Sequence, residues 1–288
     1  MQTQHDTKLV GVLSHPITEN LIYELLSSGS DASDCGTAFL QFDAQLKDLA
    51  DPVRALQSLK ARGVYLTGRL RTSAGSLVDF LSDEAHGTGI INVIAFDGDE
   101  ATGHNTEARA IVEILDPHRE SLQRGGAVIL GGGAMARSAA YALVKNFRTR
   151  FVAIADRTLQ QAQVLKQLFD GSKTDSKIEA HELFPPDIAQ LLAEAHVIIN
   201  ATSVGMSGGV EESPITLSDV FHDRQVVLDC VYNPTTTRLL EDAAAAGAHT
   251  ISGTELLIRQ VALAFELLTG AVYPESDVRR ASSPAVGA

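Results

Sequence analysis

The sequence has few cysteines and no clustered metal ligands. Only two of its 288 residues are cysteine, Cys35 and Cys230, and they do not form a CxxC pair. A disulfide framework is therefore not expected, and a reducing setting is the natural one. The nine histidines form neither an HExxH nor an HxH group, so no metal site is predicted.

Long apolar runs and an excess of basic charge are also lacking. No stretch reaches the 18 or so apolar residues that span a bilayer, and no basic start is followed by an apolar run. Lysine and arginine number 23 against 36 acidic residues, giving a net charge of −13. An acidic surface repels nucleic-acid backbones and anionic lipids, although local arginines can still hold a small anion. We therefore expect a soluble cytoplasmic protein with neither a nucleic-acid nor a membrane partner.

The pattern of apolar residues predicts an α/β fold. The length lies near the limit at which one core splits into two domains. Apolar β-rich runs alternate with segments of helical period, which is typical of largely parallel sheets. Strands are expected at 8–13, 38–42, 64–66, 90–96, 127–130, 151–155, 197–200 and 226–228. Helices are expected at 17–26, 51–62, 107–115, 134–147, 159–169, 186–194 and 255–268, with loops at 27–36, 170–177 and 207–214.

A glycine-rich segment follows the apolar run that begins at Val128. It reads GGGAMA, a GxGxxA pattern between a predicted strand and a predicted helix. Gly131 permits a tight turn, Gly133 lets the backbone approach a pyrophosphate, and Ala136 keeps the helix close to the strand. The segment therefore predicts a dinucleotide site comprising Gly131, Gly132, Gly133, Ala134, Met135 and Ala136.

The next strand ends at an acidic residue, Asp156, which bears on cofactor choice. A carboxylate at this position accepts hydrogen bonds from the ribose hydroxyls and repels a 2′-phosphate. Arg157 beside it could offset that repulsion by stacking on adenine or pairing with the phosphate. The sequence therefore favours NAD and leaves NADP open.

Three later segments resemble the shikimate dehydrogenase family, which includes quinate/shikimate enzymes. Residues 199–206 (INATSVGM) resemble its NATSxGM segment, residues 229–240 its DxVYxPxxTxLL segment, and residues 253–270 its closing helix. The resemblance implies an NAD(P)-dependent oxidoreductase whose nicotinamide lies beside residues 201–206. The further cofactor-binding residues that it implies are Ala201, Thr202, Ser203, Met206, Val231 and Gly253.

The resemblance also implies the domain layout. We expect an N-terminal α/β substrate domain over residues 1–105 and a Rossmann-type NAD(P)-binding domain over 106–250. C-terminal helices at 251–275 would return to the substrate domain. The Ser-, Arg- and Pro-containing tail at 276–288 is expected to be disordered.

The N-terminal half resembles the family in layout but differs at the residues that carry the chemistry. The family's GxNVTxPxK motif aligns without a gap with residues 63–71. Thr67 is kept, Tyr65 stands where the family has asparagine, and Arg71 stands where it has its catalytic lysine. The family's GxNTD becomes GHNTE, so Glu107 replaces its catalytic aspartate.

The remaining substrate positions are partly kept. The family's GAVNT becomes GIINV and retains Asn92, and its HSxSP becomes HPITE, in which one hydroxyl survives at Thr18. The substrate-binding residues implied by the resemblance are Thr18, Tyr65, Thr67, Asn92, Tyr232 and Gln260.

Arginine cannot simply take over the role of lysine as a proton carrier. Its guanidinium titrates above about 12, whereas burial and neighbouring charge can bring a lysine towards neutrality. Three interpretations follow. Glu107 accepts the proton while Arg71 orients it and polarises the substrate oxygen; or Tyr65, Tyr232 or His104 takes the proton from a different substrate; or Arg71 and Glu107 form a structural ion pair without turnover.

The leading hypothesis is hydride transfer between nicotinamide and a ring hydroxyl or ketone of a shikimate- or quinate-like hydroxy acid, with the substrate altered. Arg71 and Glu107 are its candidate catalytic residues. The competing hypothesis is a catalytically silent nucleotide-binding or regulatory homologue. The expected partner is a small polar hydroxy acid, bound by a monomer or homodimer.

Overall fold

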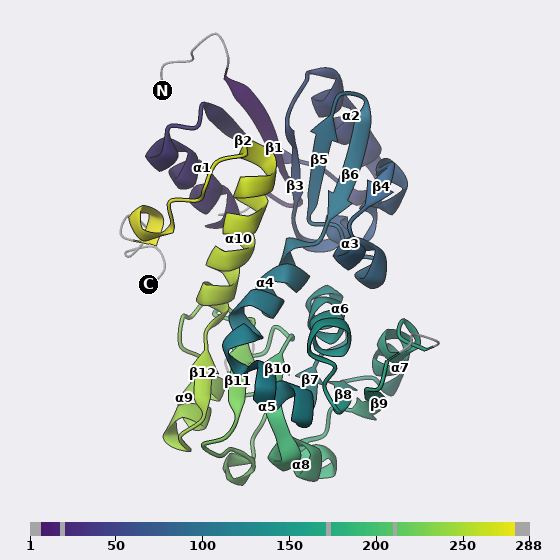
Figure 1. Ribbon diagram of the computed structural model, residues 1–288, viewed down its shortest axis with the longest axis vertical. Coiled ribbons are helices and arrows are strands. Elements are labelled where there is room, and N and C mark those ends of the chain that lie inside the picture. Colours follow the sequence, from purple (N-terminus) through teal and green to yellow (C-terminus); the bar gives the residue numbers. More distant parts are fainter. Residues whose placement is uncertain (1–6, 18–20, 171–173, 210–211, 280–288) are drawn as a thin grey trace. The chain divides into compact units, whose positions relative to one another are not determined.

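The structure, a computed structural model, describes residues 7–17, 21–170, 174–209 and 212–279. The chain forms two compact units (Figure 1). The first comprises the described residues up to Glu107 together with those from Ile258, and the second comprises Ala108–Leu257. Helix α10 (Gly253–Thr269) begins in the second unit and continues in the first. The expected α/β fold and the returning C-terminal helix are confirmed.

The first unit contains a six-stranded sheet in the order β2-β1-β3-β5-β6-β4. Its strands are β1 (Lys8–Ser14), β2 (Thr37–Asp43), β3 (Gly63–Leu66), β4 (Phe80–Leu81), β5 (Val93–Asp97) and β6 (Glu100–His104). β1 pairs in parallel with β2 and β3, whereas β5 is antiparallel to both β3 and β6. Gly98, with φ +61°, forms the turn of the β5–β6 hairpin.

Helices pack on both faces of this sheet. They are α1 (Leu21–Ser33), α2 (Ala50–Ser58), α3 (Asp83–Thr88) and the part of α10 that belongs to this unit. On one face, Phe265 of α10 stacks on Phe39 of β2 at 5.9 Å and meets Tyr273 edge-on at 5.2 Å. The Tyr273 hydroxyl donates to the carbonyl of Leu25 in α1 (3.0 Å), so the C-terminal segment is part of this core.

The second unit contains a fully parallel sheet in the order β12-β11-β10-β7-β8-β9. Its strands are β7 (Gly126–Leu130), β8 (Phe151–Asp156), β9 (Lys177–Glu182), β10 (Ala195–Asn200), β11 (Val226–Asp229) and β12 (His249–Ile251). The chain enters at the central β7, adds β8 and β9 on one side, and then adds β10 to β12 on the other. This is the strand order of the dinucleotide-binding fold, whose switch point lies between β7 and β10.

The helices of the second unit precede or connect these parallel strands. They are α4 (Thr106–Leu115, most of it in this unit), α5 (Arg119–Arg124), α6 (Ala134–Tyr141), α7 (Leu159–Gln167), α8 (Pro185–Glu194) and α9 (Arg238–Ala245). α6 continues into a π-helix over Ala142–Phe147. Buried aliphatic side chains of β7, β8 and β10 fill the core between the helices and the sheet.

Several elements differ from the sequence-based expectation. The first sheet is mixed because β5 and β6 form a hairpin. Residues 27–33, expected to be a loop, continue α1, where Gly29 allows the ring of Tyr273 to approach closely. The elements that were not predicted are β4, β6, β9, β12, α3, α5 and α9. Residues 276–279, expected to be disordered, are helical with Val278 buried, whereas residues 280–288 lie outside the described part.

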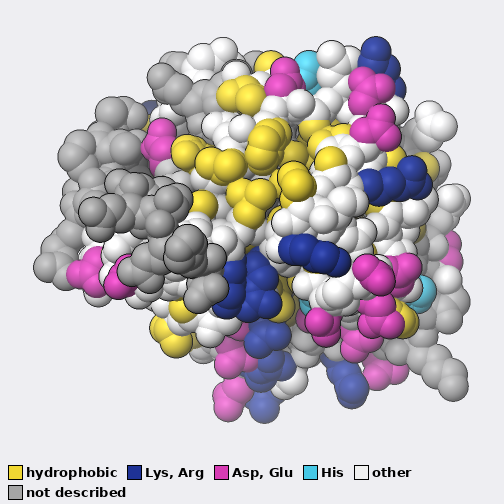
Figure 2. All heavy atoms as spheres, turned by 90° about the horizontal axis from the view of Figure 1, so that it is seen from above, with side chains coloured by type: hydrophobic (Ala, Val, Ile, Leu, Met, Phe, Trp, Pro, Cys, Tyr) yellow, Lys and Arg dark blue, Asp and Glu magenta, His cyan; other side chains and the backbone are white. Residues whose placement is uncertain are grey.

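Within the described residues, no helix is both long and apolar enough to cross a membrane. On the face drawn in Figure 2, hydrophobic side chains gather near the centre, and basic and acidic side chains lie around them. Exposed hydrophobic residues of the first unit include Leu59 (70% exposed) and Val272 (81%).

Candidate active site

Arg71 and Glu107 lie side by side in the first unit. Arg71 follows β3 in a short 3-10 helix, Gly68–Thr72, and Glu107 is in the first turn of α4. An Arg71 Nη1–H donates directly to Glu107 Oε1, and Nε donates to the carbonyl of Gly68 at 3.0 Å. The side chain of Glu107 is 2% exposed and that of Arg71 is 21% exposed. The N-terminus of α4 and the guanidinium of Arg71 both place positive charge beside this carboxylate.

A network of uncharged groups lies in the same unit. The Asn92 amide donates to the Thr106 hydroxyl (2.7 Å) and to the Tyr65 hydroxyl (3.4 Å), and Asn92 Oδ1 accepts the Thr106 N–H (2.8 Å). The Thr106 hydroxyl in turn donates to the backbone carbonyl of Gln260 (3.1 Å). Thr106 therefore ties Asn92 to α10, a role that was not predicted although Thr106 is adjacent to Glu107.

Two buried oxygens of this region have no hydrogen-bond partner among the described residues. They are Glu107 Oε2 and Gln260 Oε1, on residues that are 2% and 6% exposed. Buried acceptors without a partner cost free energy and are uncommon in native proteins. Since both accept rather than donate, a ligand that satisfies them must present O–H or N–H groups.

The charges decide which groups in the cluster can carry a proton. Burial acts to lower the pKa of Arg71, but the charge and hydrogen bond of Glu107 outweigh it and the pKa is raised. Burial, and then the charge of Glu107, raises the pKa of Tyr65 far above its usual value. Both groups therefore stay protonated at neutral pH. Burial lowers the pKa of His104, with Glu84 opposing it, so His104 is neutral.

The glycine loop of the second unit has the form that a dinucleotide requires. Gly131 has φ +108°, a conformation that side chains rarely adopt, and a Cβ there would come within 3.1 Å of the Ala201 carbonyl. Gly133 immediately precedes α6 and has open space where a Cβ would be. The amide groups of the first turn of α6 are therefore accessible to an anion, and this geometry fits a pyrophosphate.

Asp156 lies at the end of β8 and is anchored to this loop. Its Oδ2 accepts the Gly132 N–H (2.8 Å), and its Oδ1 accepts the N–H (3.0 Å) and the hydroxyl (3.3 Å) of Thr158. Oδ2, with one donor, can still accept a further one, such as a ribose hydroxyl. The neighbouring Arg157 is exposed.

The two loops that follow β10 and β11 are joined by Asn200 and Asp229. Asn200 donates to Asp229 Oδ1 at 2.9 Å and to the Val204 carbonyl at 3.1 Å. Gly253 lies so close to the Val231 carbonyl that a Cβ would overlap it, which keeps the start of α10 against this segment. The predicted residues Ala201, Thr202, Ser203 and Met206 lie on the first loop, and Val231 and Tyr232 on the second.

Three other predicted residues, Thr67, Tyr232 and Thr18, lie at the following positions. The Thr67 hydroxyl donates to the Leu13 carbonyl (3.3 Å) in the first unit. Tyr232 belongs to the second unit, where it is 38% exposed. Thr18 lies outside the described residues.

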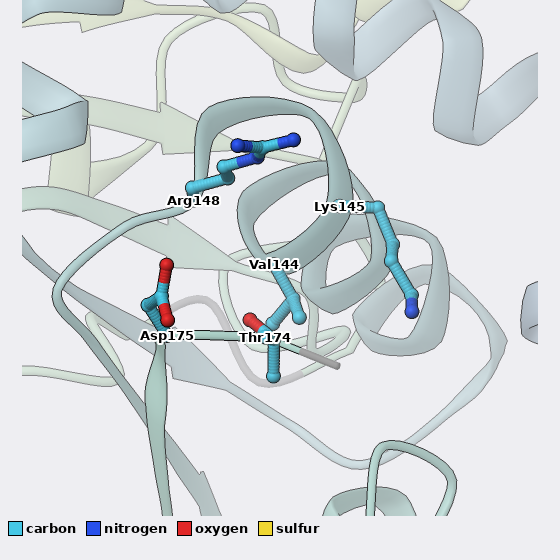
Figure 3. A pocket seen from close by; sticks show the side chains of 5 residues that line it. All are labelled: Val144, Lys145, Arg148, Thr174 and Asp175. Carbon is cyan, nitrogen blue, oxygen red and sulfur yellow. The ribbon is translucent and has the colours of Figure 1, made fainter. Parts of the chain in front are cut away.

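A cavity of about 250 Å³ in the second unit contains none of the predicted residues (Figure 3). It is lined by Val144, Lys145, Arg148, Thr174 and Asp175.

The parallel sheet in this order, the glycine loop and the acidic end of β8 together define a Rossmann-type dinucleotide-binding unit. The first unit adds a buried carboxylate paired with a cation. A protein of this class carries out chemistry on a bound small molecule with a dinucleotide cofactor.

Comparisons with known proteins agree with this assignment to a class. The sequence profile described as "Shikimate / quinate 5-dehydrogenase" matches residues 113–207. A shikimate dehydrogenase (NADP(+)) of Alkaliphilus oremlandii is 31% identical, covering 96% of each chain, and one of Halobacterium salinarum is 34% identical, covering 94% of this chain and 97% of its own. The crystal structure of shikimate 5-dehydrogenase from Listeria monocytogenes, with shikimate and NAD, has a TM-score of 0.90 and 25% identity, covering 98% of both chains.

The chain therefore belongs to the shikimate/quinate dehydrogenase family. It is an oxidoreductase of this type, and the family resemblance inferred from the motifs is confirmed. Its relatives use nicotinamide cofactors, named as NADP(+) in the curated relatives and as NAD or NADP in solved structures.

Proposed function

We propose that the protein transfers a hydride between a nicotinamide cofactor, preferably NAD, and a ring carbinol of a small shikimate- or quinate-like hydroxy acid. The observation that carries this proposal is the buried, unpartnered Oε2 of Glu107 beside Arg71. A substrate hydroxyl that donates to this oxygen would satisfy it, and Gln260 Oε1 is suited to accept from a second hydroxyl.

In this proposal Glu107 is the proton acceptor. When bound, the nicotinamide supplies the acceptor for the hydride that leaves the carbinol carbon. Glu107 Oε2 takes the hydroxyl proton as the carbon–oxygen double bond forms, and returns it in the reverse reaction. Arg71 stays charged throughout, holds the carboxylate in place through Oε1, and polarises the substrate oxygen.

The preference for NAD is supported by Asp156. Its carboxylate is fixed by Gly132 and Thr158, and it lies where a ribose 2′-oxygen is expected. A 2′-phosphate would face this negative charge, and the exposed Arg157 is the neighbouring group that could offset it. Because the curated relatives are named for NADP(+), the preference for NAD over NADP has to be measured.

The proposal of an altered substrate is supported by Arg71 and Tyr65, which stand where the family motif has lysine and asparagine. The phenol of Tyr65 is fully buried, 1% exposed, and bulkier than an amide. The substrate must therefore fit beside this ring as well as donate to Glu107.

The test is a screen of NAD- and NADP-dependent oxidation of shikimate, quinate and related cyclic hydroxy acids. We expect turnover with NAD on at least one member and slow or no turnover of shikimate. Arg71→Lys is the sharper companion: shikimate oxidation that appears only in this variant would support an altered substrate. Brisk oxidation of shikimate by the wild type would refute the argument about arginine, and tight NAD binding without any turnover would favour a silent homologue.

A further inference from the structure

Asp229 is a buried carboxylate that the proposed reaction does not use. It ends β11, and Asn200 ends the neighbouring strand β10; the two residues are paired in register. Both are 0% exposed. Because parallel strands end at the same edge of a sheet, the loops that follow them begin side by side.

The carboxylate of Asp229 accepts from three donors. Oδ1 accepts the Asn200 side-chain N–H (2.9 Å) and the Val231 backbone N–H (3.0 Å), and Oδ2 accepts the Thr237 hydroxyl (2.6 Å). Thr237 is also the N-cap of α9 and accepts the Leu240 N–H. One side chain thus joins the loop after β10, the segment after β11 and the start of α9.

These bonds set the orientation of the Asn200 amide. A carboxylate only accepts, so it faces the NH₂ side of Asn200 and leaves Oδ1 pointing at the loop. There Oδ1 accepts both the N–H (3.1 Å) and the hydroxyl (2.7 Å) of Thr202, and the Thr202 hydroxyl accepts the Val204 N–H (3.1 Å). A flipped amide would place donors against the Thr202 N–H and lose this arrangement.

We infer that Asp229 is a positioning residue for the nicotinamide half of the cofactor site. It acts through Asn200, whose amide orientation fixes residues 201–206, and through Val231. The inference rests on the proposed function, in which this loop lies beside the nicotinamide. Asp229 itself touches neither cofactor nor substrate in this account.

The acceptor at Oδ1 is the critical feature, and the negative charge is not. Burial raises the pKa of Asp229, opposed by the hydrogen bonds from Thr237, Val231 and Asn200. In Asp229→Asn the new amide nitrogen can face Thr237, whose hydroxyl can rotate to accept, so that an oxygen still faces Asn200. Asp229→Ala removes both oxygens and frees the Asn200 amide to turn.

The experiment compares binding of NADH with binding of ADP-ribose, which lacks the nicotinamide. In Asp229→Ala we expect NADH affinity to fall about tenfold relative to ADP-ribose affinity, as for loss of one hydrogen bond, and the blue shift of bound NADH emission to diminish. Asp229→Asn should stay within about threefold of the wild type. Asn200→Ala, which keeps the Val231 and Thr237 bonds, should match Asp229→Ala and carries the test if that variant does not fold.

Thr237→Val is the matched control, because it removes the hydrogen bond between the same carboxylate and the start of α9. It should lower stability without changing the ratio of the two affinities. A purely structural role would instead lower NADH and ADP-ribose binding alike in all variants, and that result would overturn the inference. So would an Asp229→Asn variant as weak as Asp229→Ala. Failure of the wild type to bind either ligand would overturn the proposed function itself.

Discussion

The Arg71–Glu107 pair gives a prediction whose size follows from the contacts. Glu107 is 2% exposed, its Oε2 has no partner, and Arg71 is the group that contacts its Oε1. Arg71→Met would therefore leave the whole carboxylate buried without its cation. Breaking a buried ion pair in this way costs about 3–5 kcal/mol. Since Arg71 is 21% exposed and water can enter in its place, we expect the lower end, about 3 kcal/mol.

Replacing both partners should remove most of that cost. In Arg71→Met/Glu107→Leu no charge is left unpaired, and such exchanges are often neutral or stabilising. The assay is urea unfolding of the wild type, both single variants and the double variant at neutral pH, analysed as a double-mutant cycle. A loss below about 1 kcal/mol in Arg71→Met, or strictly additive single effects, would refute the description of a coupled buried pair.

Three further predictions use other parts of the two units. Asp156→Asn removes the charge that opposes a 2′-phosphate, so NADP affinity should rise about tenfold relative to NAD in a binding titration; an unchanged ratio would contradict the assignment. His104 has its pKa lowered by burial, so the unfolded chain binds more protons below about pH 6.5 and stability falls as the pH drops. His104→Gln should flatten that fall between pH 7 and 5, and an identical slope would refute it. Gly253→Ala forces a Cβ against the Val231 carbonyl and should cost about 1–3 kcal/mol of unfolding free energy; a change under about 0.5 kcal/mol would contradict the close approach.

Much of the fold could be predicted because its signals are local. The apolar run that becomes β7, followed at once by the glycine loop, predicts a strand, a turn and a helix from consecutive residues. The β5–β6 hairpin was not predicted because residues 100–104 contain one small apolar residue among polar ones. This segment is a strand because it pairs with β5, and its own residue pattern does not indicate that pairing. In contrast, α9 could have been predicted from local signals, because Thr237 is a good N-cap before an amphipathic run.

The contacts within the candidate site could be predicted from the sequence only in part for a similar reason. Alignment with the family's motifs could select Arg71 and Glu107, although 36 positions separate them. The link from Asn92 through Thr106 to Gln260 spans 154 positions at its longer step and depends on how α10 returns to the first unit. The network at Asp229 likewise depends on β10 and β11 being neighbours. The strand order of the sheet determines this, and it cannot be predicted from each sequence segment taken separately.

The central claim is that Glu107 carries the proton while Arg71 remains a fixed cation. It is tested most directly by single-turnover kinetics of Glu107→Gln with NAD and the best substrate of the screen. Glutamine keeps the shape and an oxygen for Arg71, so NADH binding should stay within about twofold of the wild type. The rate of hydride transfer should fall about 10²–10⁴-fold, the usual contribution of a general base. A rate within about threefold of the wild type would contradict the account.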